Sequence, residues 1–268
     1  MDSFITANGL RFRYRDEGPR VPGTQTLFLL HGVGGRLDVW DGVVAALSAQ
    51  WRCIRCDLRG HGESAKPAGP YSLEDFVADI AGIGDALGVA RFHLAGFSLG
   101  GLIAQAFALA HPQRLASLSL FSTVAGRTPE EQARVMQRLE LVAKGIPGAH
   151  FKESILRWFT EDFVAKNPEL IEAYAARNAQ NDPAAYAAAY RVLAESDLAA
   201  RLPEIALPCL VLTGEQDQGS NPRMARLMHE RIAGSQLHIL PGLRHSILME
   251  APQLVAGILR DFVAKHPQ

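Results

Sequence analysis

Short runs of apolar and β-branched residues alternate with longer stretches of helical periodicity through most of the chain. This alternation is typical of βαβ units, in which a helix connects two parallel strands of one sheet. The pattern therefore predicts an α/β fold with a mostly parallel sheet flanked by helices. We expect strands at residues 12–15, 26–30, 52–55, 92–95, 115–121, 209–212 and 236–240, and helices at 38–49, 73–87, 99–110, 222–232 and 252–265.

The alternation stops between residues 126 and 202, where the periodicity indicates helices only. Asn167-Pro168 and Asp182-Pro183 divide this stretch, because Asp or Asn before proline favours the end of one helix and the start of the next. The sequence thus predicts a core domain from residues 1–125 and 203–268, with a helical cap inserted at 126–202. We expect the cap helices at residues 129–144, 151–159, 169–179 and 183–195.

The charge balance limits the classes of partner. With 27 basic and 28 acidic residues the formal net charge is −1, so no strong field attracts nucleic acid or anionic lipid. No apolar run approaches the roughly 18 to 20 residues of a membrane-spanning helix, and residues 1–10 lack a signal-peptide pattern. Cys53, Cys56 and Cys209 lack metal-ligand spacing and are expected to be ordinary strand thiols. We expect a cytoplasmic protein that binds a small molecule, without a metal.

One motif lies between a predicted strand and a predicted helix, at Gly96-Phe97-Ser98-Leu99-Gly100. It fits Gly-x-Ser-x-Gly, a strained strand-to-helix turn that exposes the serine oxygen above the sheet. Glycine is needed at the flanking positions because a Cβ atom there would collide with neighbouring backbone. The motif in this context predicts that Ser98 is a nucleophile.

A serine hydroxyl needs a base to take its proton and a carboxylate to orient that base. Asp217 follows the predicted strand 209–212, and His245 follows the strand 236–240. The loop after the strand 115–121 offers no carboxylate, which favours Asp217, and Glu215 is expected to be structural. Among nine histidines, only His245 combines a strand-end loop with a following serine. We therefore expect a triad of Ser98, His245 and Asp217.

Acyl transfer also requires N–H donors for the oxyanion, from the residue after the nucleophile and from the loop after an earlier strand. Leu99 supplies the first donor. The strand at 26–30 leads into His31-Gly32-Val33-Gly34-Gly35, where Val33 is the expected second donor and Gly34 the alternative. The segment matches neither dinucleotide-binding nor Walker patterns, so we expect no phosphate loop.

These features resemble the α/β-hydrolase family over nearly the whole chain, including its chain order of serine, acid and histidine. The run from Asp57 to Ser64, Asp-Leu-Arg-Gly-His-Gly-Glu-Ser, resembles a family loop that we expect to be architectural. The resemblance places His31 and His61 in loops near the site, with structural or gating roles, and makes the helical insertion the family's cap.

Within that family the cap resembles the 3-oxoadipate enol-lactonases of aromatic catabolism. The matching residues are Arg157-Trp158-Phe159-Thr160, Phe163, Pro168, Asp182-Pro183, Tyr186, Asp197-Leu198, Leu202 and Pro208. The resemblance implies a serine hydrolase that opens a small lactone or ester without a cofactor. Trp158 is expected either to line the substrate pocket or to be a core residue.

Two other functions stay open on the same residues. One is hydrolysis of a carbon–carbon bond in a ring-cleavage product, and the other is a non-enzymatic ligand sensor. Epoxide and haloalkane hydrolases are disfavoured because their nucleophile is Asp, whereas this chain has Ser98. The acyl substrate and the oligomeric state are left open.

Overall fold

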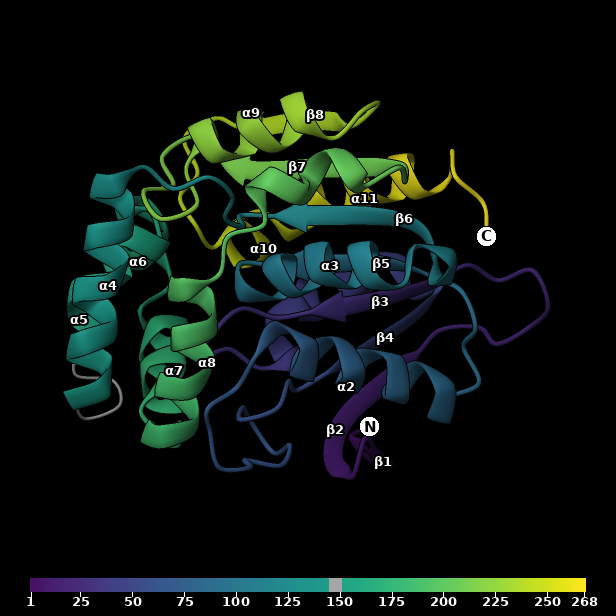
Figure 1. Cartoon of the computed structure of the whole chain (residues 1–268), viewed down its shortest axis with the longest axis horizontal. Helices are drawn as coiled ribbons and strands as arrows, with labels where there is room; N and C mark the ends of the chain where they lie inside the picture. Colours follow the sequence, from purple (N-terminus) through teal and green to yellow (C-terminus); the bar gives the residue numbers. More distant parts are fainter. Residues whose placement is uncertain (145–150) are drawn as a thin grey trace.

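One sheet of eight strands forms the centre of the computed structural model, in the order β1-β2-β4-β3-β5-β6-β7-β8 (Figure 1). The structure describes residues 1–144 and 151–268. The first two strands pair antiparallel, as do β2 and β4, and every other neighbouring pair is parallel. The α/β fold with a mostly parallel sheet is therefore confirmed. The strands are β1 (Ser3–Ala7), β2 (Leu10–Glu17), β3 (Thr26–Leu30), β4 (Arg52–Cys56), β5 (Phe92–Phe97), β6 (Leu115–Phe121), β7 (Cys209–Gly214) and β8 (Gln236–Leu240).

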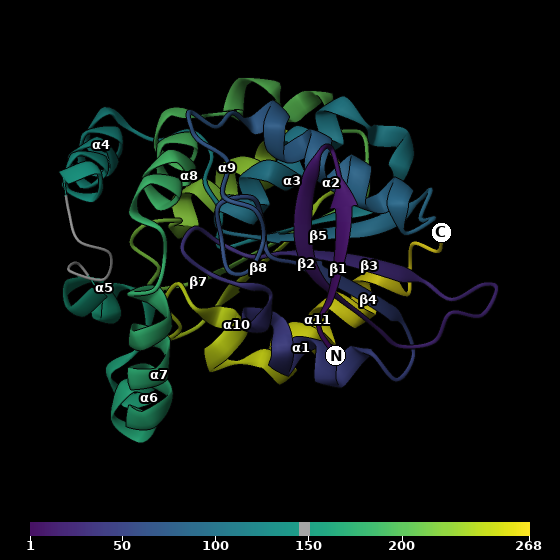
Figure 2. The same ribbon diagram turned by 90° about the horizontal axis from the view of Figure 1, so that it is seen from below.

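Helices cover both faces of the sheet (Figure 2). One face packs against α2 (Leu73–Ala86), α3 (Leu99–Ala110) and α9 (Pro222–Arg231). The other packs against α1 (Asp41–Leu47), α10 (Ile247–Glu250) and α11 (Pro252–Val263). Every residue of β3, β5, β6 and β7 is buried, which explains their continuous apolar sequences.

Several elements differ from the predicted ones. The first strand was not predicted, because four of its five residues are exposed or half-buried and it carries little apolar pattern. The predicted helix at 38–49 is a 3₁₀ turn, η1 (Leu37–Trp40), followed by the shorter α1. Two short helices, α6 (Glu161–Lys166) and α10, were also missed, since four to six residues are too few to show helical periodicity.

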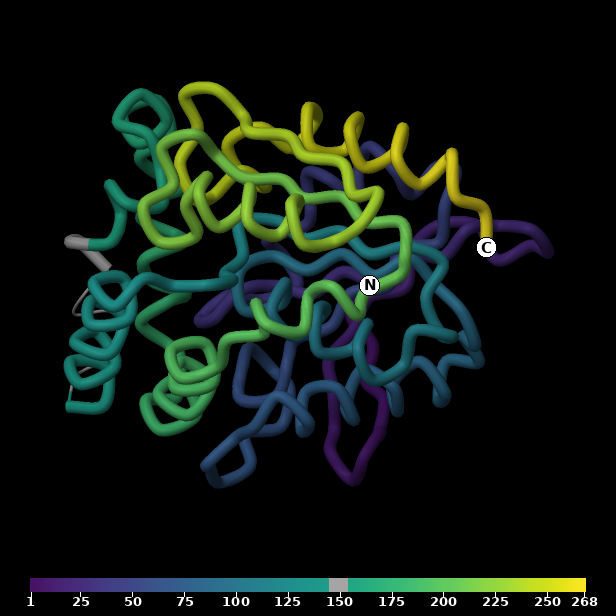
Figure 3. The backbone as a smooth tube through the Cα atoms, turned by 45° about the horizontal axis from the view of Figure 1, so that its top comes forward, coloured from purple at the N-terminus to yellow at the C-terminus, as the bar shows by residue number. Residues whose placement is uncertain are grey.

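The described residues between β6 and β7 form helices only, and we call residues 126–202 the cap. Its helices are α4 (Pro129–Lys144), α5 (Phe151–Trp158), α6, α7 (Pro168–Asn178) and α8 (Pro183–Glu195), and the 3₁₀ segment η3 (Ala199–Glu204) begins in the cap and ends in the core. As predicted, α8 begins after Asp182, whose carboxylate accepts a hydrogen bond from the Ala185 N–H at 2.9 Å. Figures 1 and 3 place the cap at one end of the molecule, beyond the carboxyl ends of the strands and far from the C-terminus.

The two ends of the cap are joined at Asp197. Its carboxylate accepts hydrogen bonds from the backbone N–H groups of Gly126 and Arg127, at 3.0 and 3.2 Å. The Arg127 guanidinium donates to the carbonyl of Leu193 at 2.7 Å, close to the end of α8. Because β6 and β7 are neighbours in the sheet, the cap leaves and rejoins the core at adjacent points.

Two further expectations concern membranes and cysteines. Within the part of the chain that the structure describes, no helix is long and apolar enough to cross a membrane.

Cys53, Cys56 and Cys209 are buried and form no disulfide. Burial raises the pKa of the Cys53 thiol to about 12, so this thiol stays protonated at neutral pH. The expectation of ordinary strand thiols is confirmed.

Candidate active site

Ser98 occupies the turn between β5 and α3, with φ 55° and ψ −116°. A serine rarely adopts a positive φ, so this residue is strained. The flanking glycines make the turn possible. A Cβ atom on Gly96 would lie 2.1 Å from the Gly100 carbonyl oxygen, and one on Gly100 would lie 2.5 Å from the Leu30 carbonyl oxygen. The steric reason for glycine inferred from the sequence is therefore confirmed.

His245 and Asp217 lie in the loops after β8 and β7. The His245 Nδ1 and the Asp217 Oδ2 are 2.7 Å apart. The other carboxylate oxygen, Oδ1, accepts hydrogen bonds from the N–H groups of Gly219 and Ser220, both at 2.9 Å. The carboxylate is thus held on both oxygens. With the ring proton on Nδ1, the His245 Nε2 is left as a proton acceptor.

A cavity of about 370 Å³ brings the predicted residues together. Ser98, Asp217, His245, Val33 and Trp158 all line it. Leu99 does not line the cavity with its side chain, which is fully buried. Its backbone N–H is the first of α3, where no partner exists within the helix. That N–H is therefore available as an oxyanion donor.

The loop after β3 forms a tight turn, which we call the oxyanion turn (Gly32 to Gly35). The Gly35 N–H donates to the Gly32 carbonyl at 3.0 Å, and Gly34 has φ +72°, as a type II turn requires. His31 donates from Nδ1 to the same carbonyl at 2.7 Å. Because a trans peptide is planar, fixing the Gly32 C=O also fixes the opposite direction of the Val33 N–H.

His31 is held in one tautomer. The Leu58 N–H donates to its Nε2 at 3.0 Å, so the ring proton lies on Nδ1, facing Gly32. Burial lowers the pKa of His31 to about 4, which keeps the imidazole neutral. His61 packs edge-on against it with ring centroids 5.0 Å apart, and burial lowers the pKa of His61 to about 3. Both rings are thus neutral supports beneath the site.

The loop predicted to be architectural is anchored by Asp57. Its Oδ1 accepts from the Leu37 N–H at 2.8 Å, and its Oδ2 accepts from the Glu63 N–H at 3.0 Å and from the Arg13 guanidinium at 3.2 Å. A Cβ atom on Gly62 would lie 2.0 Å from this carboxylate. Asp57 therefore joins three segments below the cavity, in agreement with a structural role.

The structure also locates Glu215 and Trp158, two residues for which the sequence allowed a structural role. Glu215 accepts a hydrogen bond from the Gly242 N–H at 3.0 Å on the outside of the molecule, which supports its structural interpretation. Trp158 is half-buried and lines the cavity, and its ring contacts Tyr174 edge-on with centroids 6.3 Å apart. Trp158 therefore has both of the expected positions, because its side chain lines the cavity and also packs against the apolar cluster of the cap.

The cap gives the cavity a basic wall that the sequence patterns did not predict. Its arginines are Arg127, Arg134, Arg138 and Arg157. Glu131 is the acidic cap residue among the lining residues, and it pairs with Arg223. Arg138 is half-buried and forms no ion pair with any residue in the described ranges. The spacing of Arg134 and Arg138 on a predicted helix is the signal that could have indicated this wall.

Known proteins resemble this chain both in sequence and in fold. Residues 25–252 match the family model for the alpha/beta hydrolase fold. The chain is 30% identical to 3-oxoadipate enol-lactonase 2 of Acinetobacter baylyi over 249 residues, which are 93% of this chain and 91% of that protein. The enol-lactonase of Burkholderia xenovorans superposes with a TM-score of 0.89 at 29% identity, covering 98% of this chain and 100% of the other. A thermophilic esterase from Thermogutta terrifontis also has a TM-score of 0.89, at 30% identity over 100% of both chains.

The family match spans most of the sheet and the whole cap. The resemblance to enol-lactonases expected from the sequence is confirmed, since one relative and one solved structure are enol-lactonases. The relatives named here are hydrolases that match nearly the full length of the chain. The chain therefore belongs to the α/β-hydrolase family.

Proposed function

We propose that the protein is a serine hydrolase that cleaves a small lactone or ester through a triad of Ser98, His245 and Asp217. The observation that carries this proposal is the 2.7 Å contact between His245 Nδ1 and Asp217 Oδ2, in the same cavity as a serine on a strained turn. The carboxylate keeps the His245 Nε2 free to accept the Ser98 proton, which a serine nucleophile requires.

The first half of the reaction forms an acyl-enzyme. Ser98 Oγ attacks the carbonyl carbon while its proton passes to His245 Nε2. The N–H groups of Val33 and Leu99 donate to the oxyanion. When the tetrahedral intermediate collapses, the C–O bond breaks and the leaving alkoxide takes the proton from His245. In a lactone this alcohol stays attached to the acyl group.

Water completes the cycle. His245 Nε2 takes a proton from a water molecule as the water oxygen attacks the acyl carbon. The second intermediate expels Ser98 Oγ, which recovers that proton, and a carboxylic acid is released. Every proton moves through His245, and the Asp217 carboxylate stabilises the imidazolium each time it forms.

We infer that the substrate carries a negatively charged group. Four cap arginines line the cavity, and Arg138 among them lacks an acidic partner in the described residues. Trp158 and Tyr186 add aromatic surface to the same cavity. Arginine pairs well with carboxylates when partly removed from water. The similarity to a 3-oxoadipate enol-lactonase favours a lactone among such substrates.

Turnover of a chemical panel tests the reaction. Purified protein and Ser98→Ala are assayed with enol-lactones, aryl esters and ring-cleavage diketones, and are labelled with a fluorophosphonate. We expect lactone or ester hydrolysis with kcat lower by about 10⁴ to 10⁶ in Ser98→Ala, and labelling at Ser98. Turnover of diketones alone would instead identify a carbon–carbon bond hydrolase. If the protein turns over none of these compounds and is not labelled by the fluorophosphonate, a ligand sensor is indicated.

Two esters of similar size, one with a carboxylate and one uncharged, test the basic wall. In Arg138→Gln we expect kcat/KM for para-nitrophenyl hemisuccinate to fall about 10-fold, the order of one charge-assisted hydrogen bond, and kcat/KM for the uncharged butyrate ester to change less than about twofold. The control is Arg226→Gln, an exposed arginine of α9 that does not line the cavity. Equal losses for both esters would contradict recognition of a negative charge.

A further inference from the structure

Among the described residues, one buried hydrogen bond joins the oxyanion turn to the cap. Asn181 lies between α7 and α8, and its side-chain amide Nδ2 donates to the Gly34 carbonyl at 3.0 Å. Only 6% of Asn181 is exposed. Tyr186 of α8 contacts the same point, because a Cβ atom on Gly34 would lie 2.6 Å from its ring. The cap therefore holds the core at the residue next to Val33.

This contact completes a set of restraints around Val33. On one side, His31 and the Gly35 N–H both bind the Gly32 carbonyl, at 2.7 and 3.0 Å. On the other side, Asn181 binds the Gly34 carbonyl. The Val33 N–H belongs to the same planar peptide as the Gly32 carbonyl, so His31 and the Gly35 N–H fix its direction from one end of the turn. Asn181 fixes the other end of the turn, two peptides further along, and so limits how far the turn can twist around Val33. The first restraint belongs to the core and the second to the cap.

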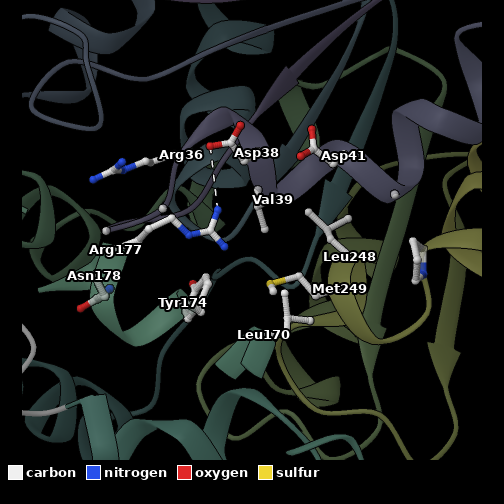
Figure 4. Close-up of a pocket in the computed structure, with 14 residues that line it drawn as sticks. Arg36, Asp38, Val39, Asp41, Leu170, Tyr174, Arg177, Asn178, Leu248 and Met249 are labelled. Carbon is white, nitrogen blue, oxygen red and sulfur yellow. Dashed lines mark ion pairs between the residues drawn. The ribbon is translucent and has the colours of Figure 1, made fainter. Parts of the chain in front are cut away.

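The oxyanion turn borders open space on two sides, although Tyr186 and Phe97 pack against its glycines. The catalytic cavity borders Gly32 and Val33. A second cavity of about 220 Å³ borders Gly34 and Gly35, and is lined further by Leu170, Met249 and other residues shown in Figure 4. Atoms that face a void lose packing contacts on that side. Hydrogen bonds therefore add to this packing in fixing the turn where it faces the two cavities.

Other contacts between the cap and this loop are more exposed. Arg177 Nη1 and Asp38 Oδ2 are 4.0 Å apart, the contact drawn as a dashed line in Figure 4. The Arg36 guanidinium donates to the Gln180 side-chain oxygen at 3.2 Å, between exposed groups. Such contacts contribute little in water. Asn181 is thus the buried polar link between the cap and the oxyanion turn.

We propose that Asn181 is a positioning residue that holds the oxyanion turn in the shape that donates the Val33 N–H, so that hydrolysis requires a correctly seated cap. The inference rests on the proposed function, because the turn matters only if Val33 stabilises an oxyanion. Through Asn181 and Tyr186, the segment that forms the substrate cavity also sets the geometry of the catalytic donor.

The neighbouring amide side chains of Asn181 and Gln180 provide a matched test of this proposal. Asn181→Ala removes the buried donor, Asn181→Asp keeps the size but replaces the donor with an acceptor, and Gln180→Ala removes the exposed neighbour. Each variant and the wild type are assayed with para-nitrophenyl acetate and for inhibition by phenylboronic acid, whose tetrahedral adduct with serine resembles the transition state. Melting temperatures are recorded in parallel.

We expect both Asn181 variants to lower kcat about 10- to 100-fold, the loss that follows from misplacing a catalytic donor by about 1 Å. We expect KM to change less than about threefold, and phenylboronic acid to bind more weakly in proportion to kcat/KM. Gln180→Ala should stay within about twofold of the wild type.

Three results would overturn the inference: an unchanged kcat in the folded Asn181 variants, a fall in kcat with unchanged boronic acid inhibition, or an equal loss in Gln180→Ala. If Asn181→Ala does not fold, Asn181→Asp alone decides, since its side chain has the same size. A wild type that neither hydrolyses the ester nor reacts with a fluorophosphonate would instead refute the proposed function, and the role of Asn181 with it.

Discussion

The strained backbone of Ser98 should cost the protein measurable stability. A residue with a side chain at φ 55° and ψ −116° stores about 1 to 3 kcal/mol of strain. Glycine relieves that strain, but loses about 0.5 to 1 kcal/mol through its greater freedom in the unfolded chain. Ser98→Gly should therefore be about 1 kcal/mol more stable than Ser98→Ala, although both lack the hydroxyl and should be inactive.

Urea unfolding followed by tryptophan fluorescence measures this difference, as a shift in midpoint at equal slope. The control is the same pair of changes at Ser246, where φ is −81° and no strain favours glycine. There we expect the alanine variant to be the more stable one. If Ser98→Ala is as stable as Ser98→Gly, or if Ser246 gives the same order as Ser98, the turn does not store strain at its nucleophile.

Three further outcomes follow from the geometry of the site. Asp217→Asn should lower kcat about 10⁴-fold by favouring the wrong His245 tautomer, and steady-state kinetics with near-normal kcat would contradict this. The pKa of His31 is about 4 in the folded protein against 6.5 in an unfolded chain, so the unfolded state takes up the proton first as pH falls. The free energy of unfolding should therefore drop by about 3 kcal/mol from pH 6.5 to 4 on account of this group. Urea unfolding at several pH values across this range should show that the free energy of unfolding changes less with pH in His31→Gln than in the wild type. The same pH dependence in both proteins would contradict the lowered pKa of His31. Gly100→Ala should destabilise the fold because its Cβ atom would lie 2.5 Å from the Leu30 carbonyl oxygen. Gly257→Ala on α11 should instead raise stability by up to about 1 kcal/mol, because its Cβ atom would meet only the Arg260 guanidinium, at an ordinary contact distance of 3.9 Å. Thermal unfolding of both variants checks the order.

The candidate catalytic residues could be predicted because each of them directly follows a strand that the sequence pattern indicates. Ser98, Asp217 and His245 each follow a strand, and parallel strands bring their carboxyl ends to one edge of the sheet. Order along the chain was therefore enough to bring them together. The first strand could not be predicted in the same way, because β1 lies at the sheet edge and exposes most of its residues.

Contacts that join distant segments lay beyond the sequence patterns. Asn181 and Gly34 are 147 positions apart, and the sequence around Asn181 indicates only a break between two helices. The binding of His31 to Leu58 N–H likewise depends on how two strand-end loops meet. Periodicity reports which face of an element is buried, but not which polar atom it meets there.

The joined ends of the cap affect how such enzymes can diversify. Because Asp197 ties the two ends together between neighbouring strands, a single recombination event with two junctions could exchange the entire segment between homologous genes. The entropy of closing a chain connection grows slowly with its length, so the scaffold should tolerate donors of different sizes. A chimaera would receive a new cavity lining in one step. If Asn181 positions the oxyanion turn as proposed, the donor segment must also supply an amide at that position.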